Sequence, residues 1–214
     1  MLDSMSHALL SRAPHRPAPA LSLMPDLSLP LGRVHELCGR ARRTLALMIA
    51  AQAGAPVIWI APAWGVDTLN PDGMQPYLAP RDVVFVRPER AGDMLWCMEE
   101  ALRAGTVPVV VADLSDPPAM TPVRRLHLAA ETGCGAGLCR PIGLLLTPGT
   151  GGAPGIETRL GLEPAHTAGQ SAWTLERLRA RMAPHKRWQV GETRAGGGLC
   201  QLRPDTRSTP APVA

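Results

Sequence analysis

The sequence predicts an α/β fold in which helices flank a mostly parallel sheet. From Arg33 onward, apolar runs alternate with helical patterns, which is typical of this fold class. The centres of the runs, such as residues 83–86 and 109–111, are continuously apolar, as strands covered on both faces are. The length of 214 residues is enough for one sizeable core with tails.

Five strands and three helices are expected in alternation. The strands are expected at residues 33–38, 57–61, 82–87, 107–112 and 141–146, and the helices at residues 44–53, 89–104 and 121–132. In the second helix Met94 and Leu102 belong to one apolar stripe, and Gly105 is a natural C-terminal stop. Thr121 as the N-cap and Pro122 after it mark the start of the third helix.

Residues 173–182 are compatible with two structures. The spacing of the leucines suits a helix. A period of two would instead place Arg177, Arg179 and Arg181 on one face of a strand. The pattern leaves both open.

The expected organisation is one core with two tails. Residues 1–30 are poor in acids and contain five prolines, so they are expected to be flexible. The core is expected to span residues 31–193, and it includes a glycine-rich loop at 147–155 and a strand-like segment at 156–163. The glycines, prolines and small polar residues of 194–214 predict a disordered tail.

The charge of the chain is mildly basic. The formal net charge is +4, and Lys186 is the only lysine, so nearly all positive charge is arginine. Arginine favours planar contacts with phosphate or carboxylate. The bias therefore permits a nucleic acid or an acidic protein as partner, although genomic base composition produces the same arginine usage.

Neither a membrane nor an oxidising compartment is expected. The uncharged stretch 44–66 is long enough to cross a bilayer, but Gly54, Pro56 and Pro62 divide it into a helix and a strand. Five cysteines are an odd number, and no secretory leader precedes them. This favours reduced thiols in the cytoplasm.

The turn between the first strand and the first helix is where a phosphate-binding loop would lie. Gly39 could open such a loop, and Thr44 could supply the hydroxyl for magnesium. There is no second glycine and no lysine, and Thr44 follows Gly39 two residues too closely. Arg42 and Arg43 near the helix N-terminus either bind a phosphate or are solvated.

The same segment carries a family resemblance. Residues 31–39 (Leu-Gly-Arg-Val-His-Glu-Leu-Cys-Gly), with 44–47 and 50–52 after them, resemble the P-loop segment of the RecA recombinase with the loop degraded. The chain resembles more closely the ImuA family, RecA-like proteins encoded beside error-prone polymerases in bacterial damage-induced mutagenesis cassettes. Segments 83–88, 99–105 and 124–133 support this by their order and spacing.

The resemblance implies a RecA-like core that has lost its ATPase machinery. Asp113 takes the place of the Walker B acid, but residues 61–65 lack the catalytic glutamate, and Thr147 replaces the glutamine that senses the γ-phosphate. Phosphoryl transfer depends on positioned charge. We therefore expect no ATPase activity and no cofactor, and the remaining role of Asp113 is that of a strand-end acid.

The resemblance also implies a function and partners. The protein would bridge RecA and an ImuB-like Y-family protein, and so help to recruit an error-prone C-family polymerase during SOS translesion synthesis. One alternative is a modulator of recombination that binds single-stranded DNA. A weaker alternative is an SOS inhibitor of cell division, which no residue favours directly.

Several residues are candidates for contact with DNA or a partner, with a solvated face or a plain connection as the competing interpretation. The basic and aromatic candidates are Arg124, Arg125, Arg177, Arg179, Arg181 and Trp188. The glycine candidates are Gly149, Gly151 and Gly152, in the place of the RecA loop that contacts single strands. Trp59 and Trp96 are expected in the core. His127 with Cys134 and Cys139 lacks the ligand spacing of a zinc site.

Overall fold

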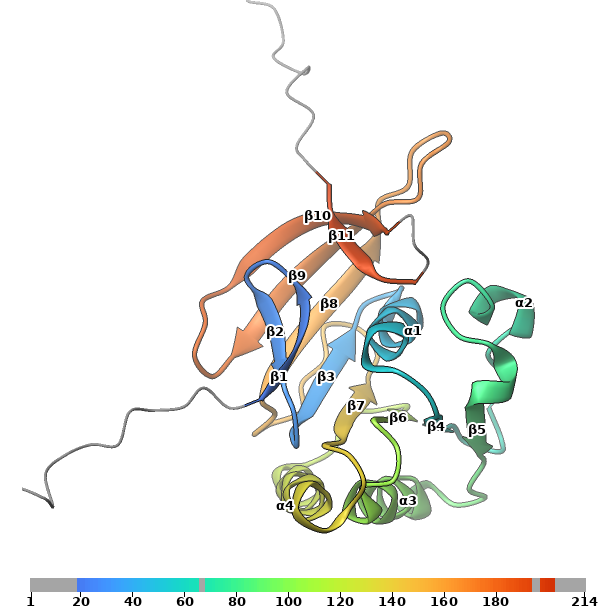
Figure 1. Cartoon of the computed structure of the whole chain (residues 1–214), viewed down its shortest axis with the longest axis vertical. Coiled ribbons are helices and arrows are strands. Elements are labelled where there is room, and N and C mark those ends of the chain that lie inside the picture. Colours follow the sequence, from blue (N-terminus) through green and yellow to red (C-terminus); the bar gives the residue numbers. More distant parts are fainter. Residues whose placement is uncertain (1–18, 66–67, 194–196, 203–214) are drawn as a thin grey trace, which may run out of the picture.

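A nine-stranded sheet forms the centre of the part of the chain that the structure describes (Figure 1). This computed structural model describes residues 19–65, 68–193 and 197–202. The strands are β3 (Val34–Cys38), β4 (Val57–Ile60), β5 (Val83–Val86), β6 (Val109–Asp113), β7 (Ile142–Leu146), β8 (Thr158–Pro164), β9 (Trp173–Ala180), β10 (Lys186–Glu192) and β11 (Leu199–Gln201). Their spatial order is β11-β10-β9-β8-β3-β7-β6-β4-β5.

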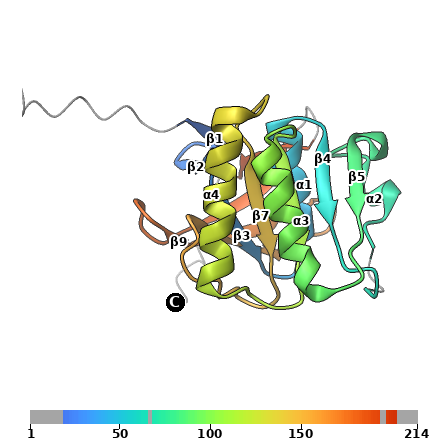
Figure 2. The same ribbon diagram turned by 90° about the horizontal axis from the view of Figure 1, so that it is seen from below.

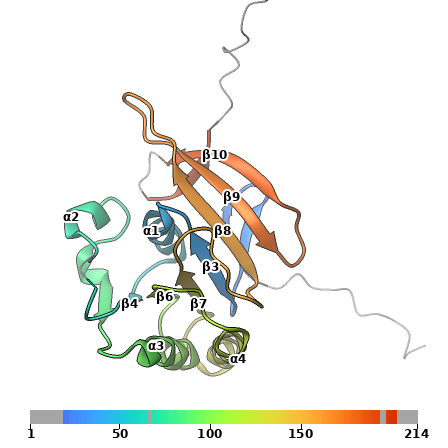
Figure 3. The same ribbon diagram turned by 180° about the vertical axis from the view of Figure 1, so that it is seen from behind.

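The sheet is mostly parallel, with an antiparallel extension. Neighbours from β8 through β3, β7, β6 and β4 to β5 pair in parallel. The strands from β8 to β11 pair antiparallel and extend the sheet to one side (Figure 3). The predicted class, α/β with a mostly parallel sheet flanked by helices, is confirmed.

Helices cover both faces of the parallel part. On one face lie α1 (Arg42–Ala53) and a hairpin of β1 (Ala20–Met24) and β2 (Leu27–Pro30). On the other face α3 (Ala91–Ala104) and α4 (Met120–Ala136) lie side by side (Figure 2). The short helix α2 (Pro71–Met74) and the 3-10 helix η1 (Pro80–Asp82) lie between β4 and β5.

The continuous apolar runs are explained by these two layers. In β6, Val109 and Val111 pack in the core beneath α1, whereas Val110 and Ala112 pack against α3 and α4. Successive side chains of a strand point to opposite faces, so a strand covered on both faces has to be apolar at every position. All five expected strands and all three expected helices are present, with ends that differ by a few residues.

Helix α4 differs most from its expected bounds. It begins at Met120 and continues to Ala136, and its N-cap is Ala119 rather than Thr121. Gly133, expected to lie just past the helix, is inside it. A Cβ at Gly133 would lie 2.1 Å from the Leu102 carbonyl oxygen, so glycine here permits α3 and α4 to approach closely rather than ending the helix. Gly105 ends α3 in the left-handed conformation, as predicted.

The prediction of a flexible segment over 1–30 is wrong for its last part. Residues 20–30 form the β1–β2 hairpin, and Leu23, Leu27 and Leu29 are buried against α1. The proline-rich composition concealed the alternation of leucines with small polar residues, which is the pattern of a strand with one buried face. Residues 1–18 lie outside the described residues.

The prediction of a disordered tail over residues 194–214 is also wrong for one part. Residues 199–201 form β11, which pairs antiparallel with β10, so the predicted disordered tail does not apply to them. Residues 194–196 and 203–214 lie outside the described residues. Residues 173–180 of the ambiguous segment 173–182 form a strand, β9, which pairs with both β8 and β10. Among the described residues, no helix combines the length and the apolar character needed to cross a bilayer.

Candidate functional site

The candidate phosphate position lies at the edge where the carboxyl ends of three parallel strands meet. Gly39 follows β3, Asp113 ends β6 and Thr147 follows β7. Ligands of open α/β sheets bind outside this edge. The turn after β3 leads directly into α1, which begins two residues before its expected start at Thr44, so Arg42 and Arg43 are the first two residues of the helix.

The backbone amides of this turn all have acceptors within the chain. The donors and acceptors, with their N···O distances, are Gly39 to the Gly149 carbonyl (2.9 Å), Arg40 to the Glu163 carboxylate (3.1 Å), Ala41 to the Leu162 carbonyl (3.0 Å) and Arg42 to the Gly39 carbonyl (3.4 Å). A phosphate-binding loop uses amides of this kind to hold the phosphates. Here a phosphate would have to displace hydrogen bonds that join the turn to β8 and to the loop after β7.

A carboxylate lies in front of the N-terminus of α1. Glu163 accepts from the Arg40 amide, and the Arg40 guanidinium donates to the same carboxylate at 2.8 Å. The hydrogen bond from the Arg40 side chain lowers the pKa of Glu163. A helix N-terminus favours a negative charge, and in this fold a side chain of β8 supplies it.

Asp113 and Arg43, at the same edge of the sheet, form an ion pair with each other. Arg43 Nε lies 2.5 Å from the carboxylate of Asp113, which is buried. Arg42 donates weakly, at 3.4 Å, to the Gly39 carbonyl. Thr44 is half-buried in the first turn of the helix. The expected Walker-B-like acid therefore forms an ion pair across the sheet edge with a residue of α1.

A buried glutamate that the sequence reasoning missed organises the loop after β7. Glu36, in the middle of β3, has no exposed surface. Its carboxylate accepts hydrogen bonds from the Thr147 hydroxyl (2.7 Å) and from the amides of Gly152 (2.8 Å) and Ala153 (3.1 Å). Arg159 on β8 forms the balancing ion pair at 2.5 Å. The available signal was an acid inside an otherwise buried strand, because such charges need partners.

The glycine candidates are held by the same contacts. The Gly149 carbonyl accepts from Gly39, and the Gly152 amide donates to Glu36. A Cβ at Gly151 would lie 2.7 Å from the Glu36 carboxylate. The loop is therefore fastened to β3 at several points and is not a plain connection.

The structure separates the basic candidates into two groups. Arg125 pairs with Glu99. Arg177 is buried, donates to the backbone carbonyls of Pro184 and Asp26, and lies over Trp188, which is also buried. Arg177 and Trp188 are therefore structural residues, and their prediction as contacts for DNA or a partner is wrong. Trp96, expected in the core, is 58% exposed on α3.

The other three basic candidates lie around one groove, which we call the α4 groove. It has a volume of about 700 Å³ and lies between α4, the segment 155–157 and the end of β9. Arg124 lines it from α4, and Arg179 and Arg181 line it from the end of β9 and the residue that follows this strand. Folding thus brings together arginines that are more than fifty residues apart in the sequence.

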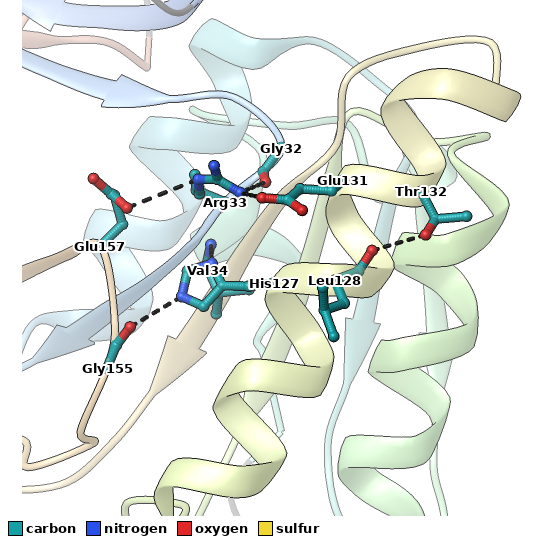
Figure 4. Close-up of polar contacts among 9 residues, drawn as sticks. All are labelled: Gly32, Arg33, Val34, His127, Leu128, Glu131, Thr132, Gly155 and Glu157. Atoms are coloured by element: carbon teal, nitrogen blue, oxygen red, sulfur yellow. Dashed lines mark hydrogen bonds and ion pairs between the residues drawn. The ribbon is translucent and has the colours of Figure 1, made fainter.

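One wall of the α4 groove is built on an ion-pair and histidine cluster (Figure 4). Arg33 pairs with Glu131 of α4 and with Glu157 of the facing segment. His127 accepts from the Val34 amide at Nδ1 (3.3 Å), and its Nε2 lies 3.2 Å from the Gly155 carbonyl. Burial lowers the pKa of His127, so the ring is neutral at neutral pH and donates through Nε2.

The contacts of His127 also concern the zinc site considered for His127, Cys134 and Cys139. Both ring nitrogens of His127 are used within the protein. Within the described part of the chain, no group of three or more potential ligand side chains is arranged to hold a metal ion. His127 ties α4 to β3 and to the segment before β8.

Neither the protein-family models nor the curated protein sequences give a match to this chain. The likeness to the ImuA family therefore rests on the segments of the sequence described above.

Proposed function

We propose that this protein is a non-catalytic, RecA-like accessory protein of translesion synthesis. By this proposal it acts in the cytoplasm and bridges the RecA recombinase and an ImuB-type Y-family protein during the SOS response, bringing the error-prone C-family polymerase to lesions. It works by binding and does not turn over a nucleotide. The family resemblance supports the choice of partners. The contacts of the turn after β3 support the absence of turnover.

The hydrogen bonds of the backbone amides of residues 39–42 are the observation that supports the absence of nucleotide turnover. All four donate to acceptors of the chain itself, and the Glu163 carboxylate faces the helix N-terminus where a phosphate would need positive potential. Phosphoryl transfer is catalysed by positioned cations and by magnesium. The single lysine, Lys186, lies on β10 and pairs with Asp26, and Asp113 pairs with Arg43.

Three measurements test the proposal. Titration calorimetry with Mg-ATP is expected to give no saturable heat, and phosphate release is expected to equal a buffer control. Purified RecA and ImuB-type protein are each expected to bind the immobilised chain. ATP binding by the immobilised chain is not expected to contribute to either affinity. Hydrolysis above the control that is lost in Asp113→Asn would show that the protein is an ATPase and would refute the proposal.

A glutamine variant sharpens the nucleotide test. Glu163→Gln removes the carboxylate that faces α1, with little change in shape. If this carboxylate is what keeps anions away, the variant is expected to gain weak affinity for inorganic phosphate relative to the wild type. Arg40→Gln is the matched control, because it breaks the same ion pair and leaves the negative charge in place.

A further inference from the structure

The α4 groove combines positive charge with exposed apolar side chains. The side chains of Arg124, Arg179 and Arg181 form no ion pair or hydrogen bond with any described residue. Met120 and Leu128 on the same helix are 39% and 63% exposed. Large exposed apolar side chains next to unpaired cations are a common composition of a binding surface.

The α4 groove carries more positive than negative charge. Glu131 and Glu157 both pair with Arg33, which balances one of the two carboxylate charges, so the other three arginines outnumber the one acid charge that remains. His127 is neutral at neutral pH because burial lowers its pKa. Four arginines and two glutamates leave two positive charges on the groove, and a complementary ligand carries about two negative charges.

The spacing along α4 selects the shape of the ligand. Met120, Arg124 and Leu128 follow one another at intervals of four residues, so they lie on one face of the helix with about 6 Å between successive positions. Side chains on one face of an extended peptide repeat at about 6.6 Å. An extended peptide with an acid between two aliphatic residues, each two positions away, therefore matches the helix.

The composition of the lining argues for a peptide rather than a nucleic acid. None of the described lining residues is a tryptophan, tyrosine or phenylalanine. Proteins that hold single strands stack bases on aromatic side chains. Two glutamates in the wall would also lie beside a phosphate backbone, whereas a short peptide places its few carboxylates only against the arginines.

We propose that the α4 groove binds an extended acidic segment of a protein partner, with one carboxylate on Arg124, aliphatic side chains on Met120 and Leu128, and a second carboxylate on Arg179 or Arg181. Charge complementarity is the basis for choosing this ligand. The inference deepens the proposed function, and it rests on that function in taking the ligand to be a protein partner.

Fluorescence anisotropy with a labelled peptide tests the assignment. The probe is Asp-Leu-Ser-Glu-Ser-Leu-Ser with blocked ends, and the matched probes replace both leucines by serine or the glutamate by glutamine. The wild type is expected to bind the first probe at least about tenfold more tightly than either matched probe, because a charge-assisted bidentate contact or two buried aliphatic side chains are lost. Equal affinity for the three probes, or no binding of the first, overturns the proposal.

Protein variants locate the peptide. Arg124→Gln and Leu128→Ser are expected to weaken binding about tenfold, because both side chains are exposed and contact the peptide directly. Arg90→Gln is the matched control: it removes one exposed arginine that does not line the α4 groove, and it is expected to leave the affinity unchanged. An NMR titration of the wild type, which needs no substitution, is expected to shift the amides of residues 124, 128 and 155.

Three further outcomes separate the proposals. A thymidine oligonucleotide that binds more tightly than the peptide, and loses affinity in Arg124→Gln, would assign the groove to nucleic acid and overturn the peptide assignment. If RecA and ImuB-type protein bind the wild type and Arg124→Gln equally, only the groove assignment is wrong. If the peptide binds but the protein hydrolyses ATP, only the proposed function is wrong.

Discussion

Arg159 and Glu36 form a buried ion pair that joins β8 to β3 beneath the loop after β7. The two residues are also direct partners in the parallel register of these strands. The Glu36 side chain has no exposed surface and that of Arg159 is 18% exposed. Arg159 in addition donates from Nη2 to the Ala153 carbonyl at 3.0 Å. One ion pair thus fixes both the neighbouring strand and the loop.

Removal of one partner of this pair is expected to be strongly destabilising. Arg159→Met leaves the Glu36 carboxylate buried without its countercharge, which costs about 3–5 kcal/mol in the free energy of unfolding. The double variant Glu36→Gln/Arg159→Met is expected to lose clearly less than the single variant, because no charge is then buried alone. Urea denaturation followed by circular dichroism measures the free energy of unfolding of the single and the double variant. A loss of stability in the double variant equal to the sum of the losses in Arg159→Met and Glu36→Gln would contradict the coupling.

Gly39 is expected to tolerate no side chain. Its φ is +87°, and a Cβ would lie 2.5 Å from the Leu162 carbonyl oxygen. Gly39→Ala should therefore cost more than the roughly 1–3 kcal/mol of the backbone conformation alone. Gly54→Ala is the matched control, because Gly54 has a φ of +97° and nothing within 4 Å of a Cβ. If thermal unfolding shows equal losses of stability for the two variants, the close contact between the turn and β8 would be refuted.

His35 is expected to make stability depend on pH between 6.5 and 4. Burial lowers the pKa of His35 to about 4, and its Nε2 lies 3.0 Å from the Pro30 carbonyl. Between these pH values the unfolded chain binds a proton that the folded chain does not, so stability is present above pH 6.5 and is lost as the pH falls. The loss amounts to roughly 3 kcal/mol by pH 4.

The pH dependence is checked with urea titrations at several pH values. His35→Gln keeps a donor for the Pro30 carbonyl but does not titrate, so its free energy of unfolding should fall less steeply over this window. A smaller slope is expected to remain from His127, whose pKa burial also lowers. Identical slopes for the wild type and His35→Gln would refute the assignment.

Leu29 tests whether the N-terminal hairpin belongs to the core. Its side chain has no exposed surface and packs with the cluster beneath α1. Leu29→Ala is expected to cost about 2–4 kcal/mol. Leu138→Ala, at a side chain that is 90% exposed, is the control and should change little. Equal stability of the two variants would show that residues 20–30 are detached from the core.

The sequence by itself determined the α/β class and the central elements. The runs at 57–60 and 109–112 are apolar at every position because both of their faces are covered, and Gly105 ends α3 because it can adopt the left-handed conformation. These signals are local, since they depend on residues that are neighbours in the chain. They also located the turn at Gly39, although not the hydrogen bonds that its amides make.

Only the tertiary structure decided which distant side chains meet. The pattern of 173–180 fits a helix or a strand, and pairing with β8 and β10 made it β9. That pairing buried Arg177 over Trp188 and left Arg179 on the surface opposite Arg124. Glu36 met Arg159 for the same reason, since neighbours in a sheet are set by the order and register of its strands. Periodicity along one segment carries no information about that order, because it reports only which face of the segment is buried.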